Sequence, residues 1–184
     1  MKFIPLFIAL ALGLAGCAGD PSRLSVTAAP SEMSVRVAVR SILVGEIALP
    51  EYANAQEVVR QSEDGLIEAV PGVIWADIPE DAMANALVRN LSQITNASVA
   101  RAPWPLANLP DAELTVRVEQ MLVRFDGQLS LSGQFAVRRD DGPWGERLRT
   151  FEIAVPTTGQ NLPDLADAHA VAWRQLAEQI ARQL

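Results

Sequence analysis

Apolar and polar residues alternate along the second half of the chain, which predicts three consecutive strands over residues 114–125, 129–137 and 151–155. The apolar positions are Leu114, Val116, Val118, Met121, Val123 and Phe125 in the first run, Leu129, Leu131, Phe135 and Val137 in the second, and Phe151, Ile153 and Val155 in the third. Their parity slips by one residue at 119–121, which predicts a β-bulge there. Asp126-Gly127 and Asp141-Gly142 supply turn residues between the runs. We therefore expect an antiparallel meander with one apolar face.

Two segments instead repeat apolar residues at the three- and four-residue spacing of a helix. The stripes are Met83, Leu87, Leu91 and Ile94 in the first segment, and Leu165, Ala168, Ala172, Leu176 and Ile180 in the second. We expect the first helix to begin near Asp77 with a capping box that includes Glu80, and Asn161 to open the second.

Shorter patterns extend the predicted sheet toward the N-terminus. Val35, Val37 and Val39 alternate with polar or small residues, as in a half-buried strand. Residues 57–61 predict another short strand, and Asp64-Gly65 predicts a hairpin that returns over 66–70. Together these patterns predict an α+β fold, with an antiparallel-rich sheet and two helices packed on one face as an α/β sandwich.

The N-terminus has the pattern of a cleaved signal peptide. Lys2 precedes an apolar run over residues 3–14, which is shorter than the roughly 20 residues that a membrane span needs. The segment Leu14-Ala15-Gly16-Cys17 resembles a lipobox, the motif at which bacterial lipoproteins are acylated on cysteine and then cleaved. This resemblance implies a lipid, palmitate included, on Cys17. The alternative is an ordinary secreted protein whose single cysteine happens to lie near the cleavage site.

We therefore divide the chain into a signal peptide (1–16), a lipidated flexible tether (17–33) and a single periplasmic α+β domain (34–184). Gly19, Pro21 and Pro30 are typical of a tether. In enterobacteria-like sorting an aspartate after the lipidated cysteine retains a lipoprotein in the inner membrane. Ala18 stands there instead, so we expect an outer-membrane lipoprotein that faces the periplasm.

The charge of the chain excludes one class of partner. Its net charge is −7, and Lys2 is the only lysine, so every cation of the mature chain is an arginine. Proteins that bind nucleic acid cluster cations that displace counterions, and this chain has no such stripe. We expect no nucleic-acid partner.

Candidate catalytic residues are scarce. His169 is the only histidine, and neither a second histidine nor a further cysteine exists to complete a metal or catalytic site with it. Asp140-Asp141 lies in a predicted turn, where aspartates usually bond the backbone. We predict that the chain is not an enzyme, has no cofactor besides the covalent lipid, and uses His169 for packing or on the surface.

Three tryptophans fall in or beside predicted loops and are candidates for an interface. We expect Trp75 and Trp104 to fold back onto the core, and Trp144, at a predicted hairpin tip, to be the better interface candidate.

Several short motifs occur in the order and spacing of a known family. They are the 35–39 run, Leu49-Pro50-Glu51-Tyr52, Ile74-Trp75-Ala76-Asp77, Asn90-Leu91-Ser92 and the closing 172–180 helix. With the lipobox, they make the chain resemble the ABC-type transport auxiliary lipoproteins, the family of the PqiC-like lipoproteins.

The resemblance implies a role beside proteins of the MCE (mammalian cell entry) type, which form lipid-conducting tunnels across the periplasm. It implies an outer-membrane component that docks with the tunnel, works with inner-membrane transporter components and supports envelope integrity. Assembly into a homo-oligomeric ring is part of the same implied role. Tyr52 and Trp75 match family motif positions and are further interface candidates. Two alternatives stay open: a self-sufficient periplasmic lipoprotein that carries lipid in a cavity between sheet and helices, and a lipoprotein hydrolase.

Overall fold

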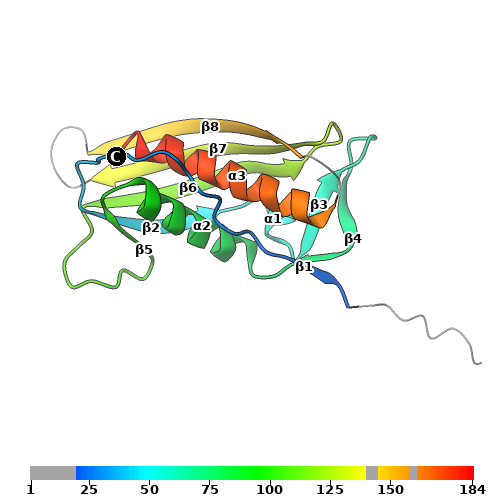
Figure 1. Ribbon diagram of the computed structural model, residues 1–184, viewed down its shortest axis with the longest axis horizontal. Coiled ribbons are helices and arrows are strands. Elements are labelled where there is room, and N and C mark those ends of the chain that lie inside the picture. Colours follow the sequence, from blue (N-terminus) through cyan, green and yellow to red (C-terminus); the bar gives the residue numbers. More distant parts are fainter. Residues whose placement is uncertain (1–19, 140–144, 158–160) are drawn as a thin grey trace, which may run out of the picture.

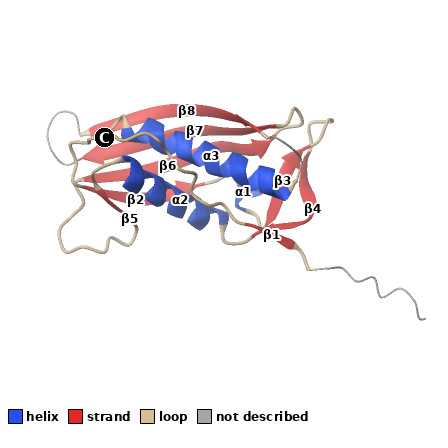
Figure 2. Cartoon of the chain, viewed as in Figure 1, coloured by secondary structure: helices blue, strands red, loops and turns tan. Residues whose placement is uncertain are grey.

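The computed structural model describes residues 20–139, 145–157 and 161–184, which form one eight-stranded sheet and three helices (Figures 1 and 2). In chain order the elements are β1 (Ser22–Leu24), β2 (Ser41–Ala48), α1 (Glu51–Asn54), β3 (Glu57–Gln61), β4 (Ile67–Trp75), α2 (Pro79–Ile94), β5 (Ser98–Arg101), β6 (Ala112–Val123), β7 (Gln128–Arg139), β8 (Glu146–Pro156) and α3 (Leu162–Ala181). None of the helices in the described ranges is long and apolar enough to cross a membrane.

The sheet is mixed, so the expectation of an antiparallel-rich sheet was wrong. The meander β6–β7–β8 and the β3–β4 hairpin are antiparallel, but β2 pairs in parallel with both β5 and β6, and β1 pairs in parallel with β4. Strand β7 pairs with one edge of β6. On the other edge of β6, β2 pairs with the first part of the strand and β3 pairs with its end, through Arg60 and Val123. Parallel neighbours need crossover connections, and local alternation cannot reveal which distant strands pair.

The predicted strand at 35–39 is also wrong, although its alternation is real. Val37 and Val39 are buried, but β2 begins only at Ser41. The Oδ1 atom of Asn96 accepts a hydrogen bond from the backbone N–H of Val37 at 2.7 Å. A side chain therefore satisfies this backbone group in place of a neighbouring strand.

The two long helices lie over one side of the sheet in the view of Figure 2. Helix α2 contacts β2 and β5, while α3 contacts β7, β8 and α2. All the residues of both predicted stripes are buried, as expected. The capping box was wrong, because α2 has Ile78 at its N-cap and no side-chain cap, whereas the side chain of Asn161 caps α3 by accepting from the backbone N–H of Asp164 at 3.0 Å.

The predicted bulge in β6 is present and lies opposite a glycine. The register with β7 shifts between Val118 and Gln120. A Cβ atom on Gly133 would lie 2.2 Å from the carbonyl oxygen of Arg117, so only glycine fits at this position. The close approach of the two strands explains why the apolar parity slips here.

Part of the segment expected to be a tether packs on the domain. Ser22–Leu24 pairs with Val73–Trp75 of β4, and both Leu24 and Val26 are buried. The chain then crosses in front of the helices in Figure 1, where the hydroxyl of Ser31 donates to Glu178 of α3 at 2.8 Å. Residues of the predicted tether, from Ser22 to Ser31, therefore contact the domain.

Candidate functional site

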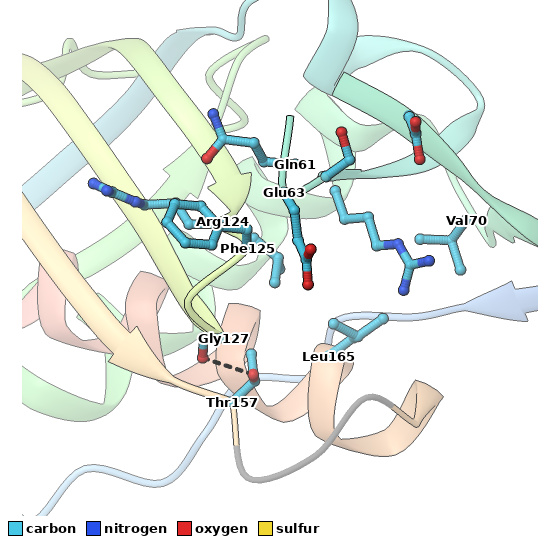
Figure 3. A pocket seen from close by; sticks show the side chains of 12 residues that line it. Gln61, Glu63, Val70, Arg124, Phe125, Gly127, Thr157 and Leu165 are labelled. Carbon is cyan, nitrogen blue, oxygen red and sulfur yellow. Dashed lines mark hydrogen bonds between the residues drawn. The ribbon is translucent and has the colours of Figure 1, made fainter. Parts of the chain in front are cut away.

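A pocket of about 320 Å³ lies where the β3–β4 hairpin, the β6–β7 turn and the start of α3 meet (Figure 3). Its lining residues are Arg60, Gln61, Ser62, Glu63, Glu68, Val70, Val123, Arg124, Phe125, Gly127, Thr157 and Leu165. The two turns form as the sequence predicts, since Gly65 and Gly127 adopt φ values of 81° and 75°. The Arg60–Val123 pair holds the two hairpins side by side.

The floor of the pocket is apolar and continuous with the hydrophobic core. Val123 and Leu165 are buried, and Val70 packs against the core. On one side, the hydroxyl of Thr157 donates to the carbonyl oxygen of Gly127 at 2.7 Å, which ties the end of β8 to the β6–β7 turn (Figure 3). This hydrogen bond and the buried apolar residues fix one side and the floor of the pocket.

The mouth of the pocket has charges of both signs. Arg60 and Glu68 come from neighbouring strands, Glu63 lies in the hairpin turn, and Nε of Arg124 lies 3.7 Å from a carboxylate oxygen of Asp126. The described lining includes neither histidine nor cysteine. A pocket of this size is at the low end for small-molecule sites.

Phe125 corrects one sequence-based assignment. The alternation places it on the inward face with Met121 and Val123, yet its side chain is 59% exposed at the rim of the pocket. Strand β6 ends at Val123, so the alternation stops being a guide two residues earlier. Leu66 and Ile67, in the β3–β4 hairpin, are exposed as well. Sequence reasoning missed all three, although each lies within two residues of an Asp-Gly turn.

The expected site residues do not form one cluster. Cys17 and Trp144 lie outside the described residues. Tyr52 is half-buried, and its hydroxyl accepts a hydrogen bond from the backbone N–H of Met121 at 3.3 Å. Trp75 is 5% exposed, so its ring belongs to the core. Trp104 is half-buried in the loop after β5, where its indole N–H donates to the carbonyl oxygen of Asn108 at 2.7 Å.

His169 is a packing residue. It is buried in α3, and its Nδ1 atom lies 3.0 Å from the carbonyl oxygen of Leu165. Burial lowers the pKa of His169 to about 4, against a smaller opposing effect of that carbonyl. The ring is therefore neutral at pH 7, with Nδ1–H as the donor.

The interface between sheet and helices is packed rather than hollow in the described part of the chain. Leu114 and Leu129 from the sheet and Leu87, Trp173 and Leu176 from the helices are all fully buried. Side chains of this volume fill the space in which a lipid carrier of the sheet–helix type would hold its ligand.

Known proteins resemble the chain along almost its whole length. It is 27% identical over 180 residues to the intermembrane transport lipoprotein PqiC of Escherichia coli K12, which covers 95% of this chain and 93% of that protein. PqiC of Shigella flexneri matches equally.

Solved structures share the fold. A crystal structure of an uncharacterized protein has a TM-score of 0.69 and 24% identity, and covers 88% of this chain and 99% of that one. The protein XCC0632 from Xanthomonas campestris has a TM-score of 0.63 and 18% identity over 88% and 90%. At these identities the likeness concerns the fold alone.

The family described as ABC-type transport auxiliary lipoprotein component matches residues 23–181, from β1 to the last residue of α3. This range includes every strand and helix of the described domain, together with both turns that build the pocket. The chain belongs to the family of ABC-type transport auxiliary lipoproteins.

Proposed function

We propose that this protein is a non-catalytic outer-membrane lipoprotein of an intermembrane lipid transport system of the MCE type, anchored through lipid on Cys17 and facing the periplasm. In this role it docks with a periplasm-spanning tunnel protein, alone or as a homo-oligomer, and supports envelope integrity. Any ATP hydrolysis belongs to an inner-membrane transporter component.

The observation that carries this proposal is the family match over residues 23–181, joined to the match with PqiC over almost the full length of both chains. A match that spans the whole domain supports a shared role better than a match confined to one motif would. The packed interior favours an adaptor over a self-sufficient lipid carrier, because an adaptor works through its surface.

For the docking surface, Trp144 stays our first candidate and Tyr52 the second. Trp75 cannot make an extensive contact with a partner, because the residue is only 5% exposed. We propose that Trp75 contributes to the fold and that any docking contact lies elsewhere.

The decisive experiment is a pull-down of the tagged lipoprotein after it has been extracted from the membranes of its own host. Mass spectrometry identifies the proteins that are recovered with it. We expect an MCE-domain protein among the recovered proteins, and we expect Trp144→Ala to reduce its recovery. Leu148→Ala is a matched control, since Leu148 is 61% exposed on β8 and is not an interface candidate. Recovery of the lipoprotein alone, with stoichiometric phospholipid, would support the lipid-carrier alternative instead.

The anchor is tested separately with Cys17→Ser. Without the thiol the lipid cannot attach, so the protein is expected to lose the acyl mass on Cys17 and to leave the outer-membrane fraction. Retention in the membrane without acylation would contradict this part of the proposal.

A further inference from the structure

Three exposed apolar side chains lie on two neighbouring turns at one end of the domain. Leu66 is 63% exposed, Ile67 44% and Phe125 59%, and we call these three residues the apolar rim. They come from the β3–β4 hairpin and the β6–β7 turn, which the Arg60–Val123 pair holds together beside the pocket of Figure 3. Exposed apolar patches in a folded domain usually mark a contact surface, and these three side chains come from neighbouring turns.

The chain enters the domain at this same end. In Figure 1, β1 lies toward the right-hand end of the long axis, where the β3–β4 hairpin and the β6–β7 turn also lie. Only Ala18 and Gly19 separate Cys17 from Asp20, the first residue of the described part. A chain of this length spans at most about 11 Å.

The link cannot lengthen without disrupting the fold. Strand β1 pairs with β4 from Ser22 to Leu24, and the side chains of Leu24 and Val26 are buried. An acyl group on Cys17 would therefore hold Asp20, which precedes β1 at this end of the long axis, within about 11 Å of the level at which the anchor enters the bilayer. The β3–β4 hairpin lies at the other end of β4 from the residues that pair with β1, so it would face the bilayer to one side of the anchor.

We propose that the apolar rim inserts into the headgroup region of the membrane that carries the anchor. The β3–β4 and β6–β7 turns would then face the bilayer. This inference rests on the proposed lipidation of Cys17. It gives the domain one fixed orientation and points the loop after β5, at the opposite end in Figure 1, away from the membrane.

The charges near the rim indicate which kind of lipid surface it meets. Arg60 and Arg124 are outnumbered by the four carboxylates of Glu63, Asp64, Glu68 and Asp126. Attraction to anionic lipid therefore contributes little, and insertion depends on the three apolar side chains. A bilayer of zwitterionic phosphatidylcholine is expected to suffice.

The test uses the full lipidated protein in phosphatidylcholine vesicles that carry a nitroxide on the headgroup. The only natural cysteine is acylated, so Asp64→Cys provides one thiol in the hairpin turn for an NBD fluorophore. Leu109→Cys is the matched control, because Leu109 is 82% exposed in the loop after β5. Acylation of Cys17 is verified by mass in each preparation.

We expect the label at position 64 to lose about half or more of its fluorescence to the headgroup quencher, while the label at 109 changes little. Replacing the rim by Leu66→Ser, Ile67→Ser and Phe125→Ser is expected to bring the label at 64 close to the level of the control. Circular dichroism checks that this variant is folded, since the three side chains are exposed and contribute little to the core.

Equal quenching at both positions, or quenching at neither, would overturn the proposal. Shielding of the label at 64 that depends on protein concentration rather than on the nitroxide lipid would also overturn it, because a second copy of the chain would then cover the rim. No tunnel protein is present in this assay, so a failed pull-down and a failed insertion test are distinguishable.

Discussion

The indole ring of Trp75 meets the imidazole ring of His169 edge-on, with 5.1 Å between the ring centroids and 75° between the ring planes. The contact joins the last residue of β4 to the middle of α3. A tryptophan from a family motif and the only histidine of the chain thus stabilise the packing of the helix on the sheet. Their shared burial makes the stability of the domain depend on pH.

Acidification is expected to destabilise the domain through His169. The pKa is about 4 in the folded protein and about 6.5 in the unfolded chain, so between these values the unfolded state binds more protons and stability rises with pH. The contribution is fully present above pH 6.5 and is lost as the pH falls through about 4. It amounts to about 3–4 kcal/mol at most, since one pKa unit corresponds to about 1.4 kcal/mol.

Urea unfolding at pH 7, 5.5 and 4.5 measures this dependence. His169→Asn, which keeps a donor for the Leu165 carbonyl but does not titrate in this range, is the control. The slope of the unfolding free energy against pH should be steeper in the wild type than in this variant. Identical slopes would show that His169 is already accessible to protons in the folded state.

Trp75 is expected to act on stability rather than on docking. Trp75→Ala should cost about 3–5 kcal/mol, because it leaves a cavity beneath α3, and Trp75→Phe should cost less because an aromatic ring remains against His169. Thermal unfolding ranks the two variants. Recovery of a partner by the folded Trp75→Phe variant should equal that of the wild type, and a specific loss there would indicate a direct contact.

Gly133→Ala is expected to destabilise by at least about 2 kcal/mol, since the new methyl group would meet the backbone of β6 at the bulge and overpack the sheet. Gly65→Ala is the matched control. Gly65 also has a positive φ, of 81°, but no atom lies within 4 Å of its added Cβ, so only conformational strain of about 1 kcal/mol applies. Denaturant midpoints of the two variants compare the steric cost with the conformational one. Equal costs would show that the bulge relaxes.

Asn90 is a polar residue in an apolar setting. It is fully buried in α2, and neither its Oδ1 nor its Nδ2 atom has a hydrogen-bond partner among the described residues. Asn90→Leu is therefore expected to leave stability unchanged or to raise it by about 1 kcal/mol, because it removes an unsatisfied polar group. Its neighbour Leu91, changed to Ala, should cost about 2–5 kcal/mol. Destabilisation by Asn90→Leu would reveal a bonding role for the amide.

Local pattern was sufficient for several features whose stabilising partners are near in sequence, although the capping box at the start of α2 was wrong. The β6–β7 turn at Asp126-Gly127, the bulge after Val118 and the Asn161 cap were all predicted, because each depends on a few adjacent residues. The predicted strand at 35–39 was wrong, and the parallel pairings were missed, because of long-range partners. Val37 alternates like a strand residue, yet Asn96, 59 positions away, bonds its backbone.

The candidate site was predictable only in its parts. Both Asp-Gly turns could be read from the sequence, but not that the Arg60–Val123 pair brings them together around a pocket. The alternation also placed Phe125 on the inward face, because a pattern of alternating residues does not show that the strand ends at Val123. Whether a side chain is exposed depends on which other segments pack beside it, and the periodicity of one strand does not contain that information.

By itself the sequence determined the turns at Asp64-Gly65 and Asp126-Gly127, the two apolar helix faces and the antiparallel meander, since each follows from residues that are near one another in the chain. It also carried the resemblance to a lipoprotein family, through short motifs in a fixed order. The predicted turn at Asp141-Gly142 lies outside the described residues. Only the tertiary structure decided the parallel pairing of β2 with β6, the burial of Trp75 against His169 and the exposure of Leu66, Ile67 and Phe125 on two neighbouring turns. The physical reason is that hydrogen-bonding and hydrophobic preferences specify what kind of neighbour a residue needs. Which distant segment supplies that neighbour depends on how all the segments pack together.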